Sequence, residues 1–180
     1  MEKSFNLSKS GKHLWTRELA AKIRVELNRL LDSSRSGEVV VIDAKDVEVF
    51  DYSFANELFG KALRSLQSEY TDRFLAVEHL TEYTRENLSK ALESLNLMMV
   101  ERRGSKLNLL GKVHPSDEET YLEIVQAKKP VSAVELKDAL DLNINATNER
   151  LTKLTNLSVI RRTQGVSESG RKQFLYTAVK

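Results

Sequence analysis

The side chains best suited to binding a ligand in this sequence are the basic residues near its end. Residues 145–180 hold seven basic and two acidic residues, a net charge of +5, whereas the whole chain carries +2. Positive charge gathered on one segment is typical of proteins that bind the phosphates of duplex DNA. The sequence therefore predicts a DNA-binding surface here, although a solvated charged face on an ordinary protein surface would give the same composition.

A helix beginning near Asn145 would hold part of this surface. Ile144, Leu151 and Leu154 recur at helical spacing and are expected to face a core. The opposite face carries Asn and Lys side chains, which can hydrogen-bond to base edges, and the arginines that follow would contact phosphates. The predicted DNA-binding residues are Asn145, Glu149, Thr152, Lys153, Asn156, Arg161, Arg162, Arg171 and Lys172.

Two further helices are expected before Asn145. Ser116 and Glu119 have the spacing of a capping box, in which the two side chains satisfy backbone amides at a helix start. Ser132 is placed to cap the helix that follows Pro130.

Two short strands, at residues 159–162 and 173–176, are expected to flank a tip at residues 164–170 that contains two Gly and two Ser. Three helices followed by a hairpin resemble the winged helix-turn-helix domains of bacterial and archaeal regulators, over residues 117–180. The resemblance implies an α+β domain at residues 116–180 whose partner is duplex DNA. It also implies a homodimer, because such regulators commonly read two half-sites with two-fold symmetry.

A second candidate site is the turn Asp51-Tyr52-Ser53, which lies between a strand and a helix. Val39 to Ile42 form a continuous β-branched run, as in a strand buried on both faces of a parallel sheet. Phe54, Leu58, Ala62 and Leu66 then follow at helical spacing. Ser53 is expected to cap that helix.

The stretch VVVIDAKDVEVFDYSFANEL resembles the central segment of STAS domains, and most closely the STAS-like branch of unknown function. In anti-sigma-factor antagonists the equivalent turn reads Asp-Ser-Ser-Gly, and a partner kinase phosphorylates its second Ser. Ser53 falls on that Ser, while Tyr52 and Phe54 replace the first Ser and the Gly. The resemblance covers residues 4–110. It implies an α/β domain at residues 1–112, Ser53 as candidate phospho-acceptor, and a histidine-kinase-like ATPase as possible partner.

Two interpretations of Ser53 stay open. As a helix cap alone it would contribute about 1 kcal/mol of stability. As a switch it would carry a phosphate that the neighbouring Asp51 and Glu57 repel, which would alter a docking surface.

Metal binding and catalysis have little support in the sequence. Asp43, Asp46, Asp51 and Glu57 have no spacing that forces them to converge, and turn carboxylates usually face water. The sequence has no phosphate-binding or dinucleotide-binding glycine motif, and no nucleophile with a base at catalytic spacing. We therefore expect no cofactor and no enzymatic activity.

Composition indicates a cytoplasmic protein with no membrane partner. The chain has 180 residues, is 41% hydrophobic and 30% charged, and lacks cysteine, which excludes disulfides and thiol chemistry. No apolar run approaches the ~20 residues of a membrane span. The combined prediction is a DNA-binding transcription regulator whose STAS-like domain takes a signal through protein docking or dimerisation. The alternative is an adaptor in a partner-switching pathway that does not bind DNA.

Overall fold

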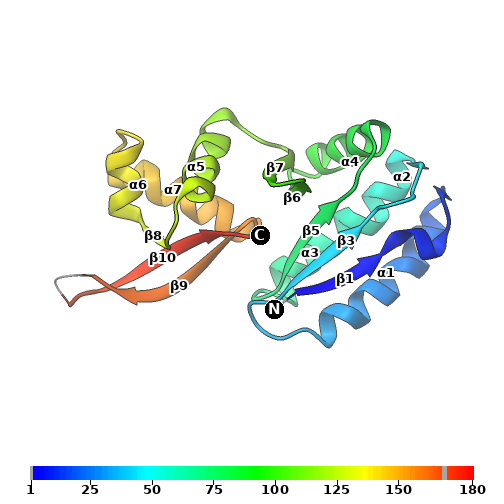
Figure 1. Ribbon diagram of the computed structural model, residues 1–180, viewed down its shortest axis with the longest axis horizontal. Coiled ribbons are helices and arrows are strands. Elements are labelled where there is room, and N and C mark those ends of the chain that lie inside the picture. Colours follow the sequence, from blue (N-terminus) through cyan, green and yellow to red (C-terminus); the bar gives the residue numbers. More distant parts are fainter. Residues whose placement is uncertain (1, 168–169) are drawn as a thin grey trace. The chain divides into compact units, whose positions relative to one another are not determined.

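A computed structural model of the chain describes residues 2–167 and 170–180. The chain divides into two compact units, one ending at Val113 and the other comprising His114–Val179. Figure 1 shows the elements of both units. Among the described residues, every helix is too short or too polar to cross a bilayer.

The N-terminal unit is built on a five-stranded sheet. Its strands, in spatial order, are β1 (Glu2–Asn6), β3 (Val39–Asp43), β5 (Phe74–Glu78), β6 (Met98–Arg103) and β7 (Lys106–Gly111). The first four are parallel, and β7 pairs antiparallel with β6. This confirms the predicted α/β class and the buried central strand, because Val39 to Ile42 are each at most 2% exposed.

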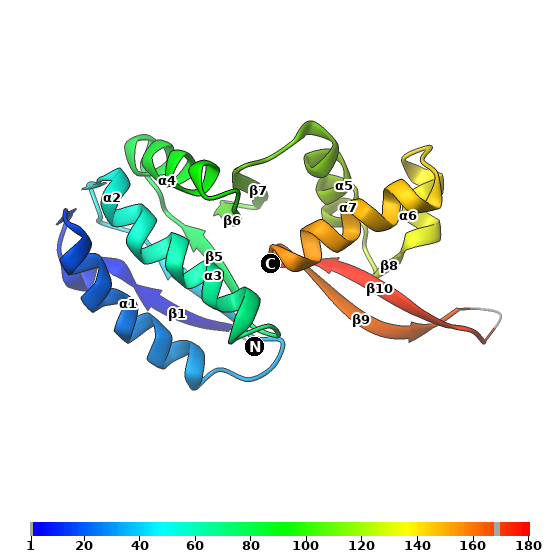
Figure 2. The same ribbon diagram turned by 180° about the vertical axis from the view of Figure 1, so that it is seen from behind.

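Helices connect the parallel strands and lie on one face of this sheet (Figures 1 and 2). They are α1 (Arg17–Asp32), the composite helix α2 (Tyr52–Ala55), η2 (Asn56–Gly60) and α3 (Lys61–Ser68), and α4 (Glu82–Ser94). Crossovers of this kind are right-handed, so strands added in one direction place all their helices on the same side. A 3-10 turn η1 (Leu7–Ser10) and a small pair of strands, β2 (His13–Leu14) and β4 (Val49–Phe50), complete the unit.

The composite helix contains a π-helical segment that sequence periodicity does not reveal. Phe54, Leu58, Ala62 and Leu66 are all at most 1% exposed, as their spacing predicts. Between them η2 runs through five residues in π geometry. Its last residue, Gly60, lies so close to α4 that an added Cβ would be 2.4 Å from Leu95 Cδ1. The π segment therefore includes a close contact of the composite helix with the C-terminal end of α4.

The C-terminal unit has three helices and a small antiparallel sheet. The helices are α5 (Pro115–Gln126), α6 (Ala133–Ala139) and α7 (Ile144–Asn156), and the strands, in spatial order, are β8 (Val131–Ser132), β10 (Lys172–Ala178) and β9 (Ile160–Val166). The predicted strand 173–176 lies within β10, whereas the predicted strand 159–162 begins one residue before β9, and both observed strands are longer than predicted. Part of the predicted tip, residues 164–166, is paired strand instead, and residues 168–169 lie outside the described residues.

The capping box predicted for Ser116 and Glu119 is wrong. His114 is the N-cap of α5 and accepts from the Ser116 backbone amide, with Pro115 in the first helical turn. The predicted cap at Ser132 is confirmed, and a capping box is found there. Glu135 accepts from the Ser132 backbone amide at 2.7 Å and hydroxyl at 2.9 Å, while Ser132 Oγ accepts from the Glu135 amide.

This capping box makes α6 sensitive to acid. The Ser132 backbone amide first, and then Lys129 and the Ser132 hydroxyl, lower the pKa of Glu135 from 4.5 to about 2. A carboxyl with a depressed pKa adds stability above its unfolded pKa and loses that contribution as pH falls. We expect the contribution of Glu135 to fade between about pH 4.5 and about pH 2. An NMR titration of its side-chain carboxyl should show a midpoint near the lower value, and a midpoint near 4.5 would contradict the cap.

Candidate nucleic-acid interface

The exposed face of α7 is polar and carries most of the predicted base-reading residues. Asn145, Glu149, Thr152 and Asn156 are all exposed. Leu151 and Leu154 are fully buried, as predicted, but Ile144 is 39% exposed and does not belong to the core. Ile144 occupies the first helical position, after the N-cap Asn143, where the helix has not yet reached its packing partner. The face therefore offers amide and hydroxyl groups suited to hydrogen bonds with base edges.

The basic residues of α7 are occupied within the unit. Lys153 Nζ lies 2.6 Å from Asp117 Oδ2, and Asp117 is 3% exposed. Arg150 Nη1 donates to the Ser116 carbonyl and to Glu119 Oε2, both at 3.2 Å. These ion pairs join α7 to the start of α5. Lys153 was predicted to reach guanine or phosphate. Its ion pair places it better to orient α7.

The β9–β10 hairpin carries the other predicted basic residues. Arg162, Arg171 and Lys172 are exposed, whereas Arg161 is partly buried. Burial lowers the pKa of Arg161 from its ordinary value, but a guanidinium stays charged at neutral pH. The hairpin's described residues 160–167 and 170–178 include no acidic side chain. The hairpin is therefore a positively charged projection of the unit.

The charge of the C-terminal unit is strongly uneven. Residues 114–179 contain nine acidic and nine basic residues, so the unit as a whole is neutral. Four of the acidic residues lie on α5: Asp117, Glu118, Glu119 and Glu123. This separation would orient the hairpin, rather than α5, toward a polyanion.

The turn that leads into α2 differs from the prediction at its cap. Asp51 is the N-cap, and its Oδ1 accepts from the Phe54 amide at 2.7 Å. Ser53 is the second residue of α2 and is half-buried. Asp and Ser are about equally good caps, so residue preference does not distinguish Asp51 from Ser53. Phe54, the residue after Ser53, is fully buried.

Glu57 was predicted to be a solvent-facing neighbour of Ser53, but the structure buries it. It is 5% exposed and lies between Lys61 Nζ at 2.7 Å and Arg24 Nη2 at 3.3 Å. Burial raises the pKa of Glu57, but the hydrogen bond from Lys61 and the charges of Lys61 and Arg24 outweigh burial and lower the pKa overall. Glu57 therefore stabilises the contact of η2 with α1.

The carboxylates Asp43, Asp46, Asp51 and Glu57 do not form a metal cluster among the described residues. Asp43 instead lies near Glu78 and His79. One potential ligand atom from each of these three residues lies within 4.8 Å of the other two. His79 Nδ1 is 2.7 Å from Asp43 Oδ1, and Arg102 Nη1 is 3.9 Å from Glu78 Oε2. The guanidinium of Arg102 thus lies beside the Glu78 carboxylate, and the His79 ring contacts the Asp43 carboxylate.

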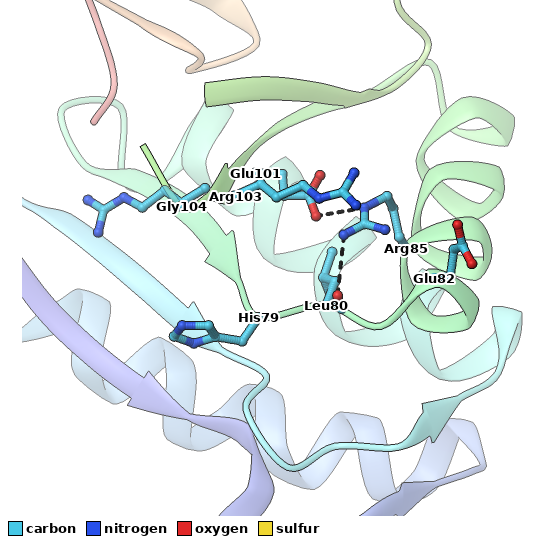
Figure 3. A pocket seen from close by; sticks show the side chains of 8 residues that line it. His79, Leu80, Glu82, Arg85, Glu101, Arg103 and Gly104 are labelled. Carbon is cyan, nitrogen blue, oxygen red and sulfur yellow. Dashed lines mark hydrogen bonds and ion pairs between the residues drawn. The ribbon is translucent and has the colours of Figure 1, made fainter. Parts of the chain in front are cut away.

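A hollow of about 360 Å³ opens at the carboxyl ends of β5 and β6 (Figure 3). Two guanidinium groups that line it, those of Arg85 and Arg102, are engaged by the protein. Arg85 Nε donates to Glu101 Oε1 at 2.7 Å and Arg85 Nη2 donates to the Leu80 carbonyl at 3.2 Å, as the dashed lines show. Arg102 Nη2 donates to Glu2 Oε2 at 2.6 Å. None of the predicted site residues lines this hollow.

Comparison with known proteins supports the resemblance of the N-terminal unit. Residues 20–85 match the STAS-like domain of unknown function (DUF4325). The matched segment runs from α1 to the first turn of α4 and includes the Asp51–Ser53 turn. No curated protein matches the sequence.

One structural neighbour is described as a possible transcriptional regulator from Methanosarcina mazei Go1. It is 14% identical in sequence, and the match has a TM-score of 0.35. The alignment covers 47% of this chain and 76% of that chain.

Proposed function

We propose that the C-terminal unit is a winged helix-turn-helix domain that binds duplex DNA, and that the chain is a transcriptional regulator. The observation that supports this most directly is the joint placement of two surfaces in one small unit. The exposed face of α7 offers amide and hydroxyl groups, and the hairpin that follows it offers the positive charge. Polar groups that read base edges and cations that hold phosphates are the two requirements of specific duplex recognition.

The connection between α6 and α7 fits this proposal. Four residues, 140–143, separate the two helices, which is the turn length of helix-turn-helix motifs. In such motifs the second helix enters the major groove. Here that helix is α7, and its ion pairs to α5 would fix its angle in the groove.

The STAS-like unit would take the signal by docking a protein partner or by dimerising. A kinase-like ATPase acting on Ser53 belongs to this proposal, as does a homodimer that presents two α7 helices to two half-sites. The neutral total charge of the C-terminal unit favours the competing possibility, an adaptor that never contacts DNA.

Salt dependence of DNA binding tests the proposal. We expect the full chain to bind duplex DNA with an affinity that falls steeply with salt. Each phosphate contact contributes about 0.9 to the slope of log affinity against log salt, so Arg171→Ala with Lys172→Ala should reduce that slope by about 2. Fluorescence anisotropy with a genomic pool of duplexes measures both quantities.

A matched control removes the same charge elsewhere. Lys9→Ala with Lys106→Ala deletes two exposed lysines of the N-terminal unit and should leave the slope unchanged. Equal slopes for both double variants would refute a role of the hairpin. No binding to any duplex at low salt would refute DNA binding and favour the adaptor.

A further inference from the structure

The β9–β10 hairpin exposes an aromatic ring toward its tip. Phe174 pairs in register with Gln164 and is 45% exposed. Its neighbour Leu175 packs on the other face, where an added Cβ at Gly165 would lie 2.5 Å from Leu175 Cδ1. Because side chains alternate along a strand, Phe174 lies on the same face of β10 as the buried Tyr176 and Ala178, but beyond the part of that face that is buried.

A guanidinium holds this ring in a defined place. Arg162 Cζ lies 4.6 Å from the centroid of the Phe174 ring, in cation–π geometry. Arg162 and Phe174 occupy diagonal positions on the same face of the two strands. The ring is therefore oriented before any ligand binds. The Arg162 guanidinium beside it carries a positive charge that suits a phosphate.

Ordinary duplex DNA offers an exposed Phe little beyond the thymine methyl group. Phosphates are held by cations and hydrogen-bond donors, and base edges are read mainly by polar groups. An aromatic ring next to cations is instead the combination that proteins use to stack unpaired bases. The sequence from 160 to 178 holds four basic residues and one acidic residue, and this net positive charge makes a nucleic acid a better occupant than a protein surface of mixed charge.

We infer that Phe174, backed by Arg162, stacks on an unpaired DNA base, so that the hairpin prefers locally opened DNA to fully paired DNA. This inference rests on the proposed DNA binding and adds a preferred state of that DNA. Stacking of one base on an aromatic side chain changes affinity on the order of tenfold.

Two probes test this with the full chain: a fully paired duplex, and the same duplex with a central run of unpaired thymines beside a fluorescent adenine analogue. We expect tighter binding of the opened duplex, on the order of tenfold. Quenching of the analogue should report stacking. Phe174→Leu keeps an apolar side chain but removes the ring, and should abolish both the preference and the quenching. Phe174→Trp should retain both.

Val166→Ala is the matched control, since Val166 is an exposed apolar residue of β9 at 65% exposure. It should leave the preference intact. Equal affinity of the parent chain for the two probes, or a preference unchanged in Phe174→Leu, would overturn the stacking role while leaving duplex binding in place. Failure to bind either probe would overturn DNA binding itself, and the stacking role with it.

Discussion

Phe54→Ala is expected to lower the free energy of unfolding of the N-terminal unit by about 3–5 kcal/mol. Phe54 is fully buried, and its ring centroid lies 5.7 Å from that of Phe50, with the rings nearly parallel at 26°. Phe50 in turn lies 5.6 Å from Phe59. Truncation would remove the transfer energy of the ring, leave a cavity that a closely packed interior fills poorly, and break the stacked pair. Urea denaturation of the full chain, with separate probes for the two units, measures the loss.

The chain offers a matched control for this prediction. Phe174→Ala removes the same side chain from an exposed position, and surface substitutions usually change stability by no more than about 0.5 kcal/mol. If Phe54→Ala cost less than about 1 kcal/mol, the ring could not be the core residue that its burial indicates. The result also bears on the STAS resemblance. The position that is Gly in anti-sigma-factor antagonists would here be a principal packing residue beside Ser53.

Gly111→Ala should destabilise the same unit by about 3 kcal/mol or more. Gly111 has φ +99°, a conformation that residues with a Cβ rarely adopt. An added Cβ would also lie 2.3 Å from the Leu97 carbonyl oxygen and 2.7 Å from Leu92 Cβ. That oxygen accepts a hydrogen bond from the Lys112 amide, so it cannot move away without breaking a backbone contact. Denaturant unfolding again gives the magnitude.

Gly104→Ala separates backbone strain from steric overlap. Gly104 also has a positive φ, +60°, but no atom lies within 4 Å of the position its Cβ would take. We expect a cost of only about 1 kcal/mol there. Similar losses of unfolding free energy at the two glycines would contradict this prediction. They would mean that the backbone of Leu97 moves away from an added Cβ at Gly111 without cost.

Local patterns predicted most of the fold because they report local physics. The β-branched run Val39–Ile42 and the helical spacing from Phe54 to Leu66 identified β3 and the composite helix. The cap at Ser132 was recognised because a good capping residue follows Pro130. Where two capping residues stood close together, as Asp51 and Ser53 do, preference alone could not choose between them. Pro115 was a missed signal, since proline favours the first helical turn and pointed to His114 as the cap.

Contacts between distant segments account for what the sequence did not indicate. The ion pair of Lys153 with Asp117 was not predicted because the two residues are 36 apart in sequence. Glu57 was assigned to solvent because Arg24 is 33 residues away. The pairing of Arg162 with Phe174 likewise depends on the register of two strands, which the flanking residues did not define. Residue types thus indicated which groups could do chemistry, whereas tertiary packing decided which of them are available for it.

The π-helical segment has a consequence for the angular phase of the composite helix. A π turn accommodates one residue more than an α turn, so it acts as a single-residue insertion that the helix absorbs without breaking. Each α-helical residue advances the chain by about 100° around the axis. Shortening η2 by one residue would therefore rotate α2 by about that angle relative to α3. Phe54 would leave the core, and Ser53 would face a different side of the unit. The segment Asn56–Gly60 thus keeps the apolar residues of α2 and α3 on one buried face. It also sets the direction in which the Asp51–Ser53 turn faces.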